Sequence, residues 1–107
     1  MDSDAIWTEL NTRKAELEKR LRAVQADLSK PLNADAEERA TQLENDEVLQ
    51  ELQTDTLREL RTIGAALTRL ENGLYGYCVR CGDPVSEERL AALPYTPFCI
   101  RCARMSI

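Results

Sequence analysis

Four cysteines near the C-terminal end of the chain have the spacing of a metal site. Residues 78 to 102 read Cys-x2-Cys-x17-Cys-x2-Cys, so that Cys78 and Cys81 form one close pair and Cys99 and Cys102 form another. Each pair turns the chain so that two thiolates face one ion, and two pairs complete a tetrahedron with Zn–S distances of about 2.3 Å. Gly82 follows the first pair and can adopt the positive φ of a tight turn. We therefore predict one structural Zn²⁺ bound by the four cysteines.

Other uses of the four thiols remain open from the sequence alone. Two disulfides could pair the thiols, iron accepts the same all-thiolate spacing, and oxidation could release the metal from a redox-sensitive site. Four protein ligands leave no open position for a water molecule, which argues against catalytic zinc. The chain has no histidine, which removes the commonest general base and any Cys/His catalytic pair. We expect no enzyme activity.

The residues around the cysteines are too few to form a core without a metal. Residues 73–107 contain few large apolar side chains, and structural zinc contributes on the order of 10 kcal/mol or more to the folding of small fingers. Between the cysteine pairs we predict a short helix over residues 86–92, capped by Ser86 and ended by Pro94 and Pro97.

Two long amphipathic helices are predicted to precede this finger. Pro31 ends the first helix, which covers about residues 3–29, because proline cannot donate to the helical hydrogen-bond ladder. Residues 30–34 then form a turn. Apolar residues of the first helix recur at heptad spacing, interrupted by Lys14: Trp7, Leu21 and Leu28 at position a, and Leu10, Leu17 and Val24 at position d.

The second helix is predicted from about residue 36 to 70. Asp35 precedes it as a cap, with Glu38 three residues later in the manner of a capping box, and Gly73 suits the left-handed residue that follows its end. The apolar phase slips near Thr56. The apolar positions are Ala40, Leu43, Leu49, Leu52, Leu57, Leu60, Ile63, Leu67 and Leu70.

These elements predict a mostly α fold with two domains. Helices joined by so short a turn lie antiparallel, so residues 1–72 are expected to form a long helical hairpin, or coiled coil, with its tip near residues 30–38. Residues 73–107 form the four-cysteine zinc finger. Residues 61–72 of the second helix are expected to extend beyond the first helix. The finger would then cover their apolar side.

Composition narrows the classes of function. The chain of 107 residues has a formal net charge of -5, and an acidic chain is repelled by a phosphate backbone. It has no apolar run of roughly 20 residues to span a membrane. The acidic N-terminus lacks the basic-then-apolar order of a signal peptide, so we expect a cytoplasmic protein without membrane partners.

The finger closely resembles that of the DksA/TraR family. The resemblance rests on the lead-in Gly73-Leu74-Tyr75-Gly76-Tyr77-Cys78, on Arg89-Leu90 between the cysteine pairs, and on Phe98-Cys99-Ile100-Arg101-Cys102. It implies a bacterial transcription regulator that binds RNA polymerase directly and not DNA. In this family the coiled coil enters the secondary channel of the polymerase with an acidic tip of the form Asp-x-x-Asp-x-Ala. Asp35, Glu38 and Ala40 occupy those positions, with glutamate in place of the second aspartate.

Two other functions stay open. The imperfect helical seam allows a protein-interaction adaptor that pairs with another coiled coil, and the finger arginines allow a DNA-binding zinc finger, although no basic helix is present to enter a groove. We expect a monomer. Members of the family that respond to ppGpp use basic side chains on the second helix near the finger and just after the last cysteine. The corresponding region here has Asp55, Thr62 and Ala103, with Arg58, Arg61 and Arg104 as the remaining cations, so the sequence does not predict a ppGpp response.

Overall fold

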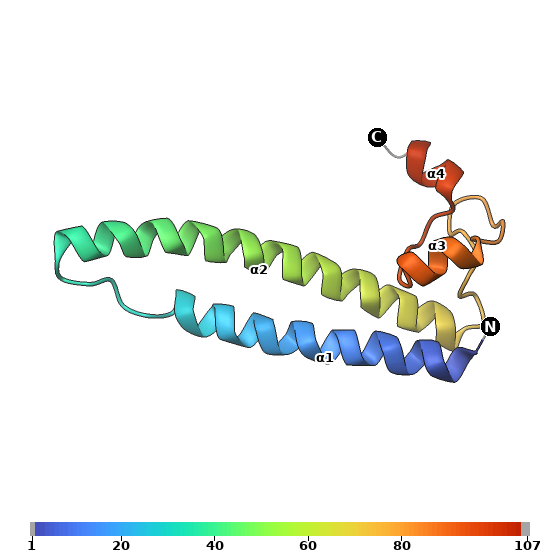
Figure 1. The fold of residues 1–107 in the computed structure, drawn as a ribbon, viewed down its shortest axis with the longest axis horizontal. Helices are drawn as coiled ribbons and strands as arrows, with labels where there is room; N and C mark the ends of the chain where they lie inside the picture. Colours follow the sequence, from blue (N-terminus) through green and yellow to red (C-terminus); the bar gives the residue numbers. More distant parts are fainter. Residues whose placement is uncertain (1, 106–107) are drawn as a thin grey trace. The chain divides into compact units, whose positions relative to one another are not determined.

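The computed structural model describes residues 2–105, which form four α-helices (Figure 1). They are α1 (Ser3–Leu28), α2 (Ala36–Glu71), α3 (Glu87–Ala92) and α4 (Ile100–Met105). The mostly helical class and the first three helices agree with the sequence prediction to within a residue or two at each end, whereas α4 was not predicted. These residues contain no β-strand beyond an isolated antiparallel bridge between Tyr77 and Pro84. The outermost residues of the predicted domains, 1 and 106–107, lie outside the described range.

The chain divides into two compact units. One unit is the segment Lys14–Leu60, and the other combines the chain before Lys14 with the chain from Arg61 onward. Each unit contains part of α1 and part of α2. The unit that includes the chain from Arg61 onward also contains the four cysteines. No helix in residues 2–105 combines the length and the apolarity that crossing a bilayer requires.

In the unit Lys14–Leu60, the part of α1 from Lys14 to Leu28 runs antiparallel to the first two-thirds of α2 (Figure 1). Leu17 and Val24 are buried, as predicted for position d. Ala40 and Leu43 were also expected in the seam, but both are exposed, Leu43 by 49%. The reason is that α1 ends at Leu28, so the first turns of α2 face the extended loop of residues 29–35 and not a helix.

Thr56 explains the slip in the apolar pattern of α2. Its side chain is 1% exposed, which makes it a buried polar residue within this unit. The hydroxyl donates to the backbone carbonyl of Leu52, one turn earlier, at 2.7 Å. A helix can bury a threonine in this way because its own carbonyl satisfies the hydroxyl.

The other unit contains the finger and both free ends of the hairpin helices. Its buried side chains come from every part of the unit: Leu10, Ile63, Ala66, Leu67, Tyr75, Val85 and Leu90. Ser3 and Leu70 line one hollow, so α1 begins level with the end of α2. The expectation that residues 61–72 extend beyond the first helix is therefore wrong. The turns of α2 that have no neighbouring turn of α1 lie at the start of α2, beside the extended loop. Trp7, expected in the seam, is 41% exposed.

The end of α2 leads directly into the finger. Gly73 has a φ of 72°, the left-handed conformation that was predicted for it. The N–H of Leu74 donates to the carbonyl of Arg69 at 2.8 Å, and the N–H of Gly73 donates to that of Leu70 at 3.3 Å. These two bonds form a Schellman motif, which satisfies the last carbonyls of the helix and turns the chain toward the first cysteine pair.

Candidate metal centre and hairpin tip

The four cysteines meet at one point in the finger. The sulfur atoms of Cys78, Cys81, Cys99 and Cys102 all lie within 4.8 Å of one another, and those of Cys81 and Cys99 are 3.7 Å apart. A tetrahedron with Zn–S bonds of 2.3 Å has edges of about 3.8 Å, so the sulfur positions fit a zinc ion. Cys81 is exposed and the other three cysteines are buried.

The first knuckle, residues 78–82, is built by backbone hydrogen bonds. The N–H of Gly82 donates to the carbonyl of Cys78 at 2.9 Å, and the N–H of Cys78 donates to the carbonyl of Asp83 at 2.8 Å. Gly82 has a φ of 78°, which a side chain would strain. The sequence prediction of a tight, positive-φ turn after the first pair is confirmed.

The second knuckle, residues 99–102, continues into α4. The N–H of Cys102 lies 3.5 Å from the sulfur of Cys99, and the N–H of Ala103 donates to the carbonyl of Cys99 at 2.9 Å. The turn that brings the two sulfurs together is therefore the first turn of a helix. Good helix formers after Cys102, namely Ala103, Arg104 and Met105, are the signal that could have predicted α4.

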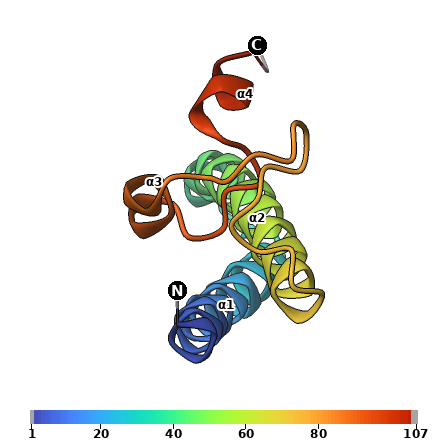
Figure 2. The same ribbon diagram turned by 90° about the vertical axis from the view of Figure 1, so that its right-hand side faces the viewer.

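Arg89 joins α3 to the segment before the second knuckle. Its Nε donates to the carbonyl of Phe98 at 3.0 Å, and its guanidinium also reaches the hydroxyl of Thr96 at 3.4 Å. The segment before the second knuckle is also bonded to the first knuckle, because the N–H of Val79 donates to the carbonyl of Pro97 at 2.9 Å. Figure 2 shows α3 and α4 of the finger with the chain that connects them. The sequence marked Arg89 only as part of a motif and gave no indication of these contacts.

The thiols differ in acidity although they lie together. Burial raises the pKa of the Cys78 thiol, but backbone N–H groups of Cys81, Cys99 and Arg80 outweigh burial and lower it to about 6. Burial raises the pKa of Cys102 to about 12, and the neighbouring thiols add to the rise. Four thiols so close repel one another once ionised, and a divalent cation at their centre removes this repulsion.

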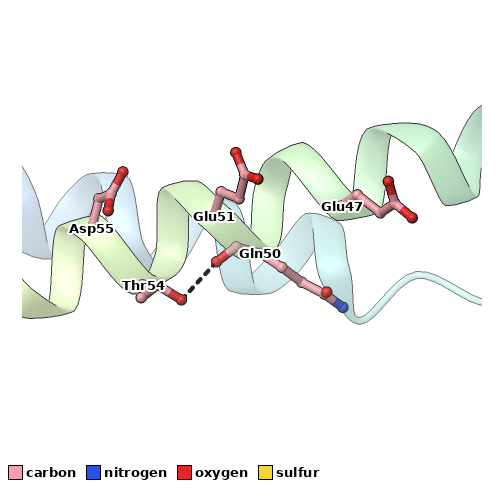
Figure 3. A pocket seen from close by; sticks show the side chains of 5 residues that line it. All are labelled: Glu47, Gln50, Glu51, Thr54 and Asp55. Carbon is pink, nitrogen blue, oxygen red and sulfur yellow. Dashed lines mark hydrogen bonds between the residues drawn. The ribbon is translucent and has the colours of Figure 1, made fainter.

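The donor set fits a closed structural zinc site. Thiolates favour zinc over hard cations such as Mg²⁺, and four of them leave no position for water. Within residues 2–105, these cysteines form the one group of three or more Cys, His, Asp or Glu side chains whose ligand atoms converge. The acidic residues of α2 do not converge in this way. One hollow of about 560 Å³ is lined by residues of α2 alone. Figure 3 shows Glu47, Glu51 and Asp55 of this lining spaced along the helix.

The predicted tip residues lie where α2 begins. Asp35, Glu38 and Ala40 are all exposed. One oxygen of Asp35 accepts hydrogen bonds from the N–H groups of Glu37 and Glu38, at 3.0 and 3.1 Å, so the predicted cap is present. The reciprocal contact of a capping box is replaced: the N–H of Asp35 donates to the side chain of Asn33, and Glu38 accepts from that same side chain.

Two family models match the chain. The model of DnaK suppressor protein-like N-terminal domains matches residues 7–70, and the model of prokaryotic dksA/traR C4-type zinc fingers matches residues 73–104. Together with the converging thiols, the second match identifies a finger with one structural zinc ion.

Similar proteins have been found in several bacteria. An uncharacterised protein of Aquifex aeolicus is 43% identical over 54% of this chain, and the uncharacterised protein YlyA of Bacillus subtilis is 34% identical over 84% of it. A protein of Caulobacter vibrioides named RNA polymerase-binding transcription factor DksA is 41% identical over 58% of the chain. The chain covers 40%, 67% and 44% of the lengths of these relatives, respectively.

Two solved structures have a similar fold. The DnaK suppressor protein of Agrobacterium tumefaciens is 47% identical, with a TM-score of 0.68 over 98% of this chain and 94% of that one. The transcription factor DksA2 of Pseudomonas aeruginosa is 27% identical, with a TM-score of 0.83 over 96% of this chain and 81% of that one. Both matches include the helical hairpin and the finger.

Proposed function

Because this chain belongs to the DksA/TraR family of C4-type zinc-finger proteins, we propose that it regulates transcription by binding RNA polymerase directly. In this proposal residues 1–72 form the hairpin that enters the secondary channel of the polymerase, with the tip near residues 30–38. Residues 73–107 form the finger. The protein acts as a monomer in the bacterial cytoplasm and catalyses no reaction of its own.

The exposed carboxylates of Asp35 and Glu38 are the observation that carries the proposal. They lie in the loop and first turn of α2, where each is held by hydrogen bonds and remains open to a partner. Carboxylates in such a position pair with basic side chains or approach a metal ion, and they repel the phosphates of nucleic acid. A protein surface is therefore the target that best suits the tip.

The role proposed for the zinc ion is structural. We assign Cys78, Cys81, Cys99 and Cys102 as its ligands, because their sulfurs have the separations of a tetrahedral site. The ion fixes both knuckles and thereby the contacts that the finger makes with α1 and α2 in its own unit.

Direct DNA binding has weaker support. The finger contains arginines 80, 89, 101 and 104 against the acids 83, 87 and 88, and a zinc ion with four thiolates adds two negative charges. Arg89 and Arg101 already donate to the Phe98 carbonyl and the Asp83 carboxylate. An adaptor role has one observation in its favour, since Leu43 and Val48 on α2 are 49% and 65% exposed.

A binding and transcription assay tests the proposal. Zinc-loaded protein should co-elute with core RNA polymerase and change transcription from a ribosomal promoter. Asp35→Asn and Glu38→Gln should reduce the change in transcription by about tenfold, the loss of one charge-assisted contact, whereas Glu38→Asp should retain it. Glu51→Gln is the matched control, because it removes one exposed charge from α2 outside the tip.

Each alternative predicts a different result. Failure of the wild-type protein to associate with polymerase at low salt would contradict the proposal. Tight, salt-sensitive binding to random duplex DNA would instead support the DNA-binding finger. Dimers in sedimentation that Leu43→Glu disrupts would support the adaptor.

A further inference from the structure

The loop of residues 29–35 is closed onto α2 by the side chain of Gln42. The Nε2 of Gln42 donates to the carbonyl of Pro31 at 2.9 Å, and its Oε1 accepts from the N–H of Asn33 at 2.9 Å. Gln42 lies in the second turn of α2, and both its amide nitrogen and its amide oxygen are hydrogen-bonded to the loop backbone. A single side chain fixes the path of the loop at two points.

The side chain of Asn33 extends this arrangement to the two tip acids. Its Nδ2 donates to a carboxylate oxygen of Glu38 at 2.8 Å, and its Oδ1 accepts from the N–H of Asp35 at 2.9 Å. One amide therefore orients the Glu38 side chain and the Asp35 backbone together. The cap that Asp35 provides then fixes the Asp35 side chain on the first turn of α2.

These contacts are short compared with the other hydrogen bond from α2 to Asn33, in which the guanidinium of Arg39 donates to the Asn33 carbonyl at 3.5 Å. Every residue from Ser29 to Glu38 is exposed, so burial does not order this segment. An exposed glutamate otherwise samples many rotamers, and binding a partner would then have to meet the cost of ordering it. A neutral amide donor orients Glu38 without cancelling its negative charge, which a lysine or arginine in the same place would do.

We infer that Asn33 and Gln42, the amide pair, are positioning residues that preset the Asp35 and Glu38 carboxylates for contact with RNA polymerase. The inference rests on the proposed function for its partner, but the hydrogen bonds of the amide pair can be tested without polymerase. It assigns a role to two residues that the sequence pattern did not single out.

The first test measures the loop directly. In amide hydrogen exchange of the zinc-loaded chain, Gln42→Ala should speed exchange at the Asn33 N–H by about fivefold, the effect of losing one net hydrogen bond. Gln50→Ala is the matched control, because it removes an exposed glutamine from α2 outside the amide pair. Unchanged exchange at Asn33 in Gln42→Ala would overturn the inference.

The second test uses the transcription assay. Asn33→Asp keeps the acceptor for the Asp35 N–H but replaces the donor to Glu38 with a repelling carboxylate. We expect it to raise the concentration for half-maximal effect about tenfold. Asn45→Asp adds the same charge to the same end of α2 and should have less than about a twofold effect.

A double-mutant cycle separates positioning from a general structural role. If Asn33 acts through Glu38, then Asn33→Asp should have little further effect in the Glu38→Gln background. An equal loss in both backgrounds, or an equal loss in Asn45→Asp, would overturn the inference while the proposed function stands. A wild-type protein without effect on polymerase would overturn the proposed function and the positioning role together, and the exchange experiment would still report whether the amide pair holds the loop.

Discussion

Tyr75 connects the lead-in to the first knuckle with the segment that follows α3. Tyr75 is 8% exposed, and its hydroxyl donates to the carbonyl of Pro94. Burial raises the pKa of this hydroxyl, and the Glu9 carboxylate adds to the rise, while Arg69 opposes it. The fold therefore favours the neutral, donating form of Tyr75.

The raised pKa gives a pH dependence with a definite sign. A tyrosine whose folded pKa exceeds its unfolded value of about 10 stabilises the fold below that value, and this contribution is lost as pH rises through the folded pKa. Tyr75→Phe should lower the free energy of unfolding by about 1 kcal/mol at pH 8. Above about pH 10 the difference from the wild type should shrink, because the wild type loses its hydroxyl proton.

Urea unfolding of the zinc-loaded protein at pH 8 to 11 checks this expectation. Tyr77→Phe is the matched control, since Tyr77 is 50% exposed and lies two residues further along the same segment. A difference between Tyr75→Phe and the wild type that grows above pH 10 would contradict the assigned role of the hydroxyl.

Arg89 should control the affinity of the finger for zinc. Arg89→Met keeps much of the apolar stem but removes the donors to the Phe98 carbonyl and the Thr96 hydroxyl, which precede Cys99. We expect zinc affinity to fall by about tenfold or more, because the second knuckle loses its fixed position. Competition with a chromogenic chelator measures this, with the exposed Arg104→Met as control. Equal affinities for both variants would contradict the prediction.

At the scale of residues, the sequence revealed chemistry that depends on local spacing. The cysteine pairs, the Ser86 cap and the Asp35 cap all follow from residues a few positions apart, and the structure contains both caps. It could not reveal the contacts of Gln42, whose partner Pro31 lies eleven positions earlier. The same holds for Arg89. Such pairs depend on how the loops fold back, which periodicity does not encode.

At the scale of elements, the seam of the hairpin offers a direct test of why Thr56 is buried. Its hydroxyl is satisfied by the carbonyl of Leu52 within the same helix, so that removing it leaves no partner group from another element unpaired. Thr56→Val should therefore raise the free energy of unfolding by up to about 1 kcal/mol, because it replaces a buried hydroxyl with a methyl group of similar size.

A second substitution distinguishes polarity from volume. Thr56→Ala removes the hydroxyl and also leaves a small cavity, and should destabilise the protein by about 1 kcal/mol. Thermal unfolding of the three proteins measures the order of stability. If Thr56→Val proved less stable than the wild type, the hydroxyl itself would be required for the seam.

Helix positions were easier to predict than helix register. Capping residues, Pro31 and Gly73 marked the ends of α1 and α2. The number of loop residues was predicted nearly correctly, but the loop was expected to form a compact turn near residues 30–34. In the structure the loop runs extended to Asp35, which leaves Ala40 and Leu43 without a facing helix. Loop path is a three-dimensional property that neither heptads nor caps define.

At the scale of the whole molecule, the two units should respond differently to removal of the metal. All four cysteines lie in the unit formed by the chain before Lys14 and the chain from Arg61 onward. The buried residues Leu17, Val24 and Thr56 lie in the unit Lys14–Leu60. A chelator should abolish exchange protection at the N–H groups of Cys78 and Val79, because structural zinc supplies on the order of 10 kcal/mol or more to such fingers. Protection near Leu17 and Val24 should persist.

Residue-resolved hydrogen exchange before and after chelation measures this difference. Readdition of one equivalent of zinc should restore the protection at Cys78 and Val79. Protection in the finger that survives full chelation would show that the fold does not need the metal. Simultaneous loss across both units would show that they unfold as one cooperative body.

The exposure of Cys81 separates the kinetics of the metal site from its thermodynamics. Three of the four cysteines are buried, so an incoming chelator can approach the ion mainly along the side where Cys81 meets the solvent. We therefore expect the rate of metal exchange to depend mainly on dissociation of the Cys81 thiolate, whereas the equilibrium constant reflects all four thiolates. A bulky neighbour placed over Cys81 would slow exchange in both directions and leave the affinity nearly unaltered.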